Sequence, residues 1–199
     1  MAKLYFRYGT MDSAKTLNLL AVAHNYRKQG KKVVLVKPQL DDRFGEAEIR
    51  SRSGLQAPAD MLVRAGDAVD AAAFEGVDCV LVDEAQFMDP AFIDAMRDLT
   101  KTEGIPVICY GLRTDFQTRL FPGARRLFEL ADSIEEVKVT CQYCSKKAVF
   151  NMRMTDGAPV FEGAQVQLGA DESYAPVCFT HYKAAALEAG VSWPLTFDD

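Results

Sequence analysis

The sequence lacks three features that would each point to a particular class of protein. It has no excess of positive charge, because 23 Lys and Arg residues stand against 28 Asp and Glu residues, and its pI is near 5.2. Nucleic-acid binders carry a basic footprint, so general nucleic-acid binding is disfavoured, whereas a local basic cleft for a phosphorylated ligand is not. No apolar run approaches the roughly 18 residues of a membrane span. The first residues, MAKLYFRYG, lack the apolar core of a signal peptide. We therefore expect a cytoplasmic protein with no membrane or nucleic-acid partner.

The composition that is present is typical of a soluble globular protein. The chain has 199 residues, of which 49% are hydrophobic and 26% are charged. This length is enough for one ordinary domain with a small appended module. The five cysteines, in a cytoplasmic chain, are expected to be thiols or metal ligands rather than disulfides.

Apolar segments typical of core strands alternate with helical segments over the first 135 residues. Residues 15–29 place apolar side chains at roughly helical spacing, and Gly30 follows where a helix ends. A second helix is expected at 89–100, with Asp89 as N-cap and Pro90 at the first helical position. Strands are expected at 3–9, 32–38, 77–87 and 105–111. This alternation predicts a parallel sheet in an α/β domain.

The character of the sequence changes near residues 134–138. Beyond this point, short strands, turns and cysteines replace the alternating pattern. We therefore expect two domains, an α/β nucleotide-binding domain at 1–136 and a metal-stapled module at 137–199. The final segment, 190–199, shows no clear period, and we expect it to be partly disordered.

The segment YGTMDSAKT, residues 8–16, nearly matches the phosphate-binding loop G-x-x-x-x-G-K-[ST]. Gly9, Lys15 and Thr16 have the required spacing, and the second glycine is replaced by Ala14. The loop would follow a strand and open a helix, so that backbone N–H groups and the helix N-terminus face phosphate oxygens. Lys15 would reach the β- and γ-phosphates, and Thr16 would bind Mg²⁺. An ordinary strand–turn–helix with a chance Lys-Thr pair explains this stretch about equally well.

A pair of acids after a later strand favours the phosphate-binding interpretation. In CVLVDE, Asp83 and Glu84 directly follow four residues of apolar strand. Phosphate-loop enzymes place an acid at the end of a neighbouring strand to hold the metal ion, which suits Asp83. Glu84 could then accept the proton of an attacking hydroxyl. Strands often end in a single solvated acid, but an adjacent pair is explained less well in that way.

Two further pairs of residues predict a metal site. CQYC supplies Cys141 and Cys144, and CFTH supplies Cys178 and His181. Two matched pairs of this spacing form a tetrahedral Cys₃His zinc site, which we interpret as structural because no acid or open ligand position accompanies it. Cys79 and Cys109 lie within apolar strands and are expected to be core residues.

Together these motifs resemble the zinc-containing thymidine kinases of bacteria and the animal cytosol. The resemblance rests on KLYFRYGTMDSAKT, DDRFG, VLVDEAQF, CYGLRTDF, LFPGARRLFELAD and the two zinc pairs, in family order across residues 3–185. It implies a RecA-like domain with a zinc-stapled lasso domain. It also implies transfer of the ATP γ-phosphoryl group to the 5′-hydroxyl of thymidine or deoxyuridine in nucleoside salvage, by a homotetramer that uses Mg²⁺.

The resemblance also implies roles for individual residues. Glu84 matches the general base and Asp83 the metal-associated acid. The other matched positions fall into two groups. The nucleotide group is Gly9, Thr10, Met11, Asp12, Ser13, Ala14, Lys15, Thr16, Asp41 and Arg43. The nucleoside group is Met11, Phe87, Leu112, Phe116, Phe121, Asn151, Gln165, Leu168, Gly169 and Tyr174.

Two positions depart from the family pattern. The family usually has glycine at Ala14 and serine or threonine near Asn151. Glycine is required where φ is positive or where a Cβ would strike the phosphate. We predict that the loop works with Ala14 in place, with a negative φ and its methyl group turned away from the anion. Two alternatives remain open: a phosphate-loop ATPase without a nucleoside acceptor, and a non-catalytic zinc-ribbon protein with a decayed loop.

Overall fold

The structure, a computed structural model, describes residues 1–39, 47–165 and 173–193. The chain forms two compact units. Unit 1 comprises residues 1–8, 14–113 and 121–137, and unit 2 comprises residues 9–13, 114–120 and 138–199. Whether 1–136 and 137–199 behave as separate domains stays a prediction. Among the described residues, no helix combines the length and the apolar character that crossing a membrane requires.

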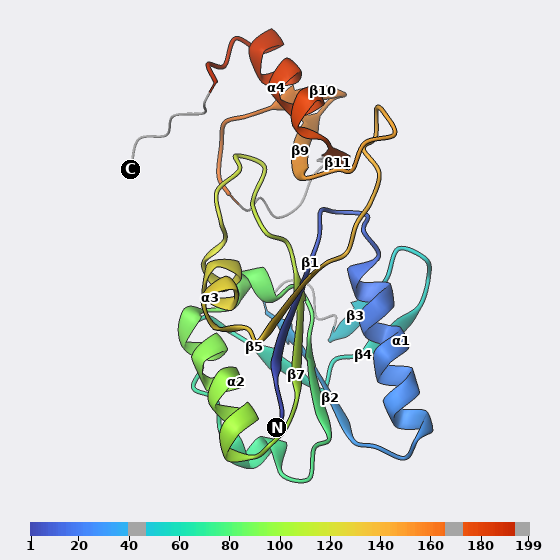
Figure 1. The fold of residues 1–199 in the computed structure, drawn as a ribbon, viewed down its shortest axis with the longest axis vertical. Coiled ribbons are helices and arrows are strands. Elements are labelled where there is room, and N and C mark those ends of the chain that lie inside the picture. Colours follow the sequence, from blue (N-terminus) through green and yellow to red (C-terminus); the bar gives the residue numbers. More distant parts are fainter. Residues whose placement is uncertain (40–46, 166–172, 194–199) are drawn as a thin grey trace. The chain divides into compact units, whose positions relative to one another are not determined.

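Unit 1 is built on a six-stranded sheet, and every strand pair in it is parallel (Figure 1). The strand order is β5-β2-β6-β7-β1-β8. The strands are β1 (Leu4–Tyr8), β2 (Val33–Pro38), β5 (Met61–Val63), β6 (Cys79–Val82), β7 (Val107–Gly111) and β8 (Ser133–Glu136). The predicted parallel α/β sheet is therefore confirmed.

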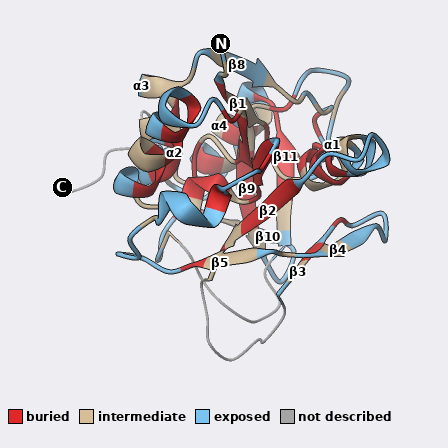
Figure 2. Ribbon diagram, turned by 90° about the horizontal axis from the view of Figure 1, so that it is seen from below, coloured by how far each residue is buried: buried red, intermediate tan, exposed pale blue. Residues whose placement is uncertain are grey.

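Helices cover both faces of this sheet. In Figure 1, α1 (Lys15–Lys28) lies on one side of the strands, and α2 (Pro90–Thr102) and α3 (Pro122–Leu130) lie on the other. Each strand contributes side chains to both faces of the sheet because successive side chains point in opposite directions. In β6, Cys79 and Leu81 pack with α1, whereas Val80 and Val82 pack with α2 and α3. Strands buried on both faces are mostly apolar, as in β2, where Lys37 alone is charged and half-buried, and Figure 2 shows β2 among the buried stretches.

The residues at the start of α2 determine where this helix begins. Asp89 is the N-cap of α2 and Pro90 is its first residue, as predicted. The Asp89 carboxylate accepts a hydrogen bond from the backbone N–H of Gly66 (2.6 Å), and so ties the helix start to a loop. On the face of α1, a short hairpin of β3 (Glu48–Arg50) and β4 (Gln56–Pro58) adds Ile49 to the core. Two 3-10 turns, η1 (Ala71–Phe74) and η2 (Ala85–Phe87), flank β6.

Unit 2 has its own small core. Its antiparallel sheet has the order β10-β9-β11, formed by β9 (Phe150–Thr155), β10 (Ala158–Val160) and β11 (Ser173–Val177), and α4 (Phe179–Glu188) follows directly. Met152, Phe161, Val177 and Tyr182 are among its buried apolar residues. Of the expected disordered tail, residues 194–199 lie outside the described residues.

Candidate active site

The carboxyl ends of the parallel strands position the catalytic candidates of unit 1. Ala14, Lys15 and Thr16 are the next residues of unit 1 after β1, and Asp83 and Glu84 follow β6. Both strands run parallel to β7, which lies between them, so their carboxyl ends meet at one edge of the sheet. This edge is where open α/β sheets bind ligands. Lys15 and Thr16 stand at the start of α1, which is an anion-binding position.

Thr16 and Asp83 lie side by side at this edge. The Thr16 Oγ1 hydroxyl is 3.3 Å from each carboxylate oxygen of Asp83, and the backbone N–H of Asp83 donates to the carbonyl of Val36 (2.9 Å). Asp83 is only 6% exposed, and Lys15 is also buried. Burial is the main cause that raises the pKa of the Asp83 carboxyl above its usual range, followed by the negative charge of Glu84. Thr16 and the Lys15 charge lower it in part. This buried acid therefore favours a compensating cation.

These oxygen atoms fit Mg²⁺. Magnesium prefers oxygen ligands and is usually bound by one or two carboxylates together with the phosphates of a substrate. The Thr16 hydroxyl and the Asp83 carboxylate supply protein oxygen ligands, and a bound nucleotide would supply the phosphates. Metal ion and lysine together would neutralise the charge of a transferred phosphoryl group.

The prediction of a negative φ at Ala14 is wrong. Ala14 caps α1 in the left-handed conformation, with φ 60° and ψ 27°. Its carbonyl already accepts the first helical hydrogen bond, from the backbone N–H of Asn18 (3.0 Å). The chain must turn sharply from loop to helix within this one residue, and left-handed backbone makes that turn. Such backbone costs an alanine roughly 1–2 kcal/mol, which explains why a glycine suits the position. Asp12 in the same loop also has a positive φ of 62°.

Glu84 is half-buried and is the N-cap of the η2 turn. It too has left-handed backbone, with φ 48° and ψ 40°. Its carboxylate accepts a hydrogen bond from Nε2 of Gln86 (2.6 Å). Phe87 and Phe121 pack edge to face beside this turn, with ring centroids 5.3 Å apart. The backbone of Leu112 donates to Gln86 Oε1 (2.9 Å). Four of the predicted residues are thus brought together in unit 1.

Unit 2 brings together five predicted nucleoside-binding residues through two hydrogen-bonded groups. In the first group, the buried Asn151 accepts from the backbone N–H of Met11 (2.7 Å) and donates to the carbonyl of Thr114 (3.4 Å). In the second, Gln165 donates to Asp115 (2.9 Å). The remaining two residues, Phe116 and Tyr174, contact the buried Arg153.

That arginine, Arg153, was not among the site residues predicted from the sequence. Arg153 is 1% exposed, and its guanidinium lies 3.6 Å from the centroid of the Phe116 ring. It donates to the Tyr174 hydroxyl (3.1 Å) and to the carbonyl of Ala164 (2.9 Å). Its position in β9, between two methionines, was the available signal, because a charged residue within an apolar strand needs partners. Asp41, Arg43, Leu168 and Gly169 lie outside the described residues.

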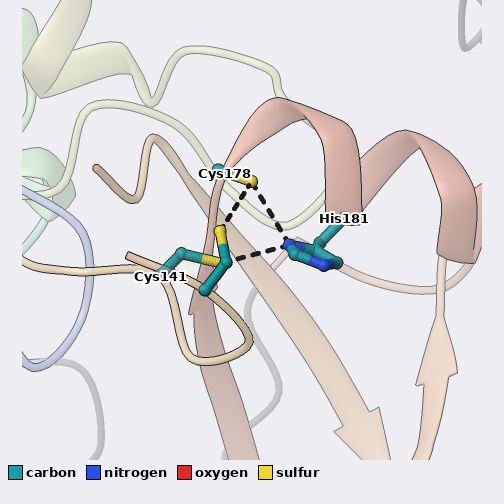
Figure 3. Close-up of side chains that lie close together, drawn as sticks. Cys141, Cys178 and His181 are labelled. Carbon is teal, nitrogen blue, oxygen red and sulfur yellow. Dashed lines mark hydrogen bonds between the residues drawn. The ribbon is translucent and has the colours of Figure 1, made fainter. Parts of the chain in front are cut away.

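The four predicted metal ligands of unit 2 converge, and Figure 3 labels three of them, Cys141, Cys178 and His181. Ligand atoms of Cys141, Cys144, Cys178 and His181 all lie within 4.8 Å of one another. Nδ1 of His181 is 3.4 Å from the sulfur of Cys141 and 3.3 Å from that of Cys178, and the sulfur atoms of Cys144 and Cys178 are 3.8 Å apart. A tight turn and the start of α4 each supply two ligands.

The electrostatics of this cluster suit a cation. The backbone N–H of His181 is the main cause that lowers the pKa of the Cys178 thiol, to about 6. The backbone N–H of Tyr143 donates to the sulfur of Cys141 (3.4 Å). Thiolates are the ligand form of cysteine, and three thiolates with one imidazole match a structural zinc site. Cys79 and Cys109 are fully buried core residues, as expected, and no disulfide joins any of the five cysteines.

Comparison with known proteins identifies a family over most of the chain. The sequence model of the thymidine kinase family matches residues 2–182. A thymidine kinase of Lactococcus lactis subsp. lactis (strain IL1403) is 45% identical over 185 residues, which is 92% of this chain and 97% of the relative. A thymidine kinase of Streptococcus thermophilus (strain CNRZ 1066) is 46% identical over 189 residues, which is 92% of this chain and 94% of the relative.

Proposed function

The chain belongs to the thymidine kinase family and uses ATP to phosphorylate thymidine, and we propose that the accepting group is the 5′-hydroxyl of thymidine or deoxyuridine. The family match does not favour an ATPase without an acceptor or a non-catalytic zinc-ribbon protein. The observation that carries the proposal for the chemistry is the Thr16–Asp83 pair with Glu84 beside it, at the carboxyl edge of the parallel sheet.

We propose that Glu84 is the general base and that Lys15, Thr16 and Asp83 serve the phosphates and Mg²⁺. Phosphoryl transfer depends on positioning and on neutralising charge. The buried Lys15 contributes positive charge, and Thr16 and Asp83 offer oxygen ligands to the metal ion. Glu84 orients the attacking hydroxyl and accepts its proton. The loop 9–14 supplies backbone N–H groups to the phosphates.

The nucleoside-binding residues are proposed from the resemblance together with their positions within each unit. In unit 1, Phe87, Leu112 and Phe121 offer apolar and aromatic surface beside the Glu84 turn. In unit 2, the hydrogen-bonded groups of Asn151 and of Gln165 offer polar atoms, and Met11, Phe116 and Tyr174 offer apolar contacts. Asp41, Arg43, Leu168 and Gly169 are included on the resemblance alone.

We further propose that the Cys₃His cluster holds a structural zinc ion. The four donors lie within 4.8 Å of one another, close enough for small shifts to place them around one ion, and the ion would join the turn at 141–144 to the start of α4. A thiolate cluster of this kind needs reducing conditions, which supports a cytoplasmic location. The resemblance supports a homotetramer, and the mass of the assembly in solution tests it.

The test of the catalytic proposal compares two substitutions under conditions where chemistry limits the rate. Glu84→Gln keeps the shape and removes the proton acceptor, so turnover with thymidine should fall by roughly 10²–10⁴, with ATP binding little changed. Lys15→Ala should weaken ATP binding as well as turnover. Glu103→Gln, the same substitution at an exposed glutamate, is the matched control and should remain active. Near-normal turnover of Glu84→Gln would show that Glu84 is not the base.

A further inference from the structure

We propose that Gln86 is a positioning residue for the reaction, which holds the Glu84 carboxylate in one orientation. The proposal rests on the role of Glu84 given above. Gln86 is completely buried within the η2 turn, two residues after the proposed base. Its Nε2 amide donates to Glu84 Oε2 (2.6 Å), and its Oε1 accepts from the backbone N–H of Leu112 (2.9 Å). A buried amide therefore connects the end of β7 with the proposed base.

The orientation of this amide is determined by its partners. A backbone N–H can only donate, so the oxygen end of the Gln86 side chain must face Leu112. The NH₂ end is then directed at Glu84, where it can only donate. A carboxylate that accepts such a bond has one oxygen fixed and the other available.

The backbone around Glu84 is held by two close approaches. A Cβ added at Gly111, the last residue of β7, would lie 2.6 Å from Gln86 Oε1 and 3.1 Å from the Gln86 backbone nitrogen. A Cβ added at Gly123 in α3 would lie 2.4 Å from the carbonyl oxygen of Ala85. Only glycine admits the η2 turn this closely from both sides. The surroundings thus maintain the left-handed backbone of Glu84, which an isolated glutamate would rarely adopt.

The arrangement indicates a specific division of roles. The backbone contacts fix where the Glu84 Cα lies, and the Gln86 amide fixes how its carboxylate turns. A half-buried glutamate has several rotamers, and catalysis by a general base needs the one that reaches the attacking hydroxyl. Gln86 would then affect turnover through Glu84 and leave nucleotide binding unchanged. If Gln86 merely stabilised the fold, its loss would act independently of Glu84.

A double-mutant cycle on the full-length protein separates these roles. The variants are Gln86→Met, which keeps the length and removes both polar ends, Glu84→Gln, and the two combined. Gln86→Met should lower kcat by roughly ten- to a hundredfold, the value of a hydrogen bond to a charged group, with the KM for ATP unchanged. Added to Glu84→Gln, it should lower kcat little further, because residues that act through one another are not additive. Gln29→Met, at an exposed glutamine, is the control.

Each outcome bears on a distinct claim. Normal kcat in Gln86→Met, with a large loss in Glu84→Gln, would overturn the positioning role and leave the proposed function intact. Equal fold losses from Gln86→Met in both backgrounds would also overturn it, because the effect would then bypass Glu84. Normal turnover in Glu84→Gln would instead remove the base assignment on which the proposal rests. If Gln86→Met does not fold, Gln86→Leu also removes the donor facing Glu84, with a smaller side chain, and should show the same loss of kcat.

Discussion

Replacing Ala14 by glycine should stabilise the protein without altering its affinity for ATP. Ala14 holds a left-handed backbone with φ 60° at the start of α1, where glycine incurs no steric penalty. The residue is exposed, so removal of its methyl group leaves no cavity. The substitution therefore isolates the conformational effect of one methyl group in the phosphate loop.

The size of the effect follows from two opposing contributions. Relief of left-handed strain is worth about 1–2 kcal/mol for an alanine. The greater freedom of glycine in the unfolded chain opposes this by about 0.4–1 kcal/mol. Glycine is also a better N-cap than alanine, which adds to the gain. A net increase of roughly 0.5–1 kcal/mol in the free energy of unfolding should raise Tm by about 1–4 °C for a chain of this size.

Thermal and denaturant unfolding of the zinc-loaded protein measure this increase, and titration with ATP and Mg²⁺ measures affinity. Ala21→Gly, at an exposed site inside α1, is the matched control and should lower stability by about 1 kcal/mol, because glycine weakens a helix interior. Destabilisation by Ala14→Gly would refute the reasoning about strain. ATP binding that appears only in Ala14→Gly would mean that the natural loop does not work.

Two further predictions concern stability away from the phosphate loop. Purified protein should contain about one zinc per chain, which metal analysis measures. Cys144→Ser should lower both the metal content and the stability of unit 2, which chelator-dependent unfolding measures. Fully folded protein with no bound metal would contradict this prediction. Asp132→Asn should reduce the free energy of unfolding by about 1 kcal/mol at pH 7, because the carboxylate accepts from Arg97 and from the backbone N–H of Leu4 (2.9 Å). The Arg97 hydrogen bond is the main cause that lowers the pKa of Asp132. The stabilisation by the carboxylate is therefore present above pH 4 and is lost as pH falls below that value. A difference in stability between the two proteins that persists at pH 3 would contradict the assignment.

The strands and helices of unit 1 were predictable where their local patterns are strong. Apolar runs predicted β1, β2, β6 and β7, and the capping residues Asp89 and Pro90 predicted the start of α2. The strand expected at 77–87 was too long, because β6 ends at Val82 and Ala85–Phe87 form the η2 turn. The three-residue strands β3, β4 and β5 were missed because a period cannot be read over so few residues. Strand β8, Ser133–Glu136, is polar and lies at the sheet edge, where its pairing with β1 sets its structure.

The site was predictable where one residue type signals one chemistry. Cysteine pairs signal zinc, and an acid pair after a strand signals a metal ion and a base. Gln86 and Arg153 were not identified, because their partners are fixed by tertiary structure. Leu112 lies 26 residues beyond Gln86, and the Tyr174 hydroxyl lies 21 residues beyond Arg153. The left-handed φ of Ala14 was missed because the sequence shows a small residue at that position without showing the turn that the residue must make.

Ala14 and Glu84 both have strained backbone, but relieving the strain should have different consequences at the two positions because their side chains differ. Both have positive φ, and both stand at the edge of the sheet where Thr16 meets Asp83. At Glu84 a glycine would relieve the strain and remove the proposed base, so the strain accompanies a side chain that the chemistry needs. At Ala14 the side chain is one exposed methyl group, to which no role in the chemistry is assigned. The strain at Glu84 should therefore be inseparable from activity, whereas the strain at Ala14 should be removable with a gain in stability.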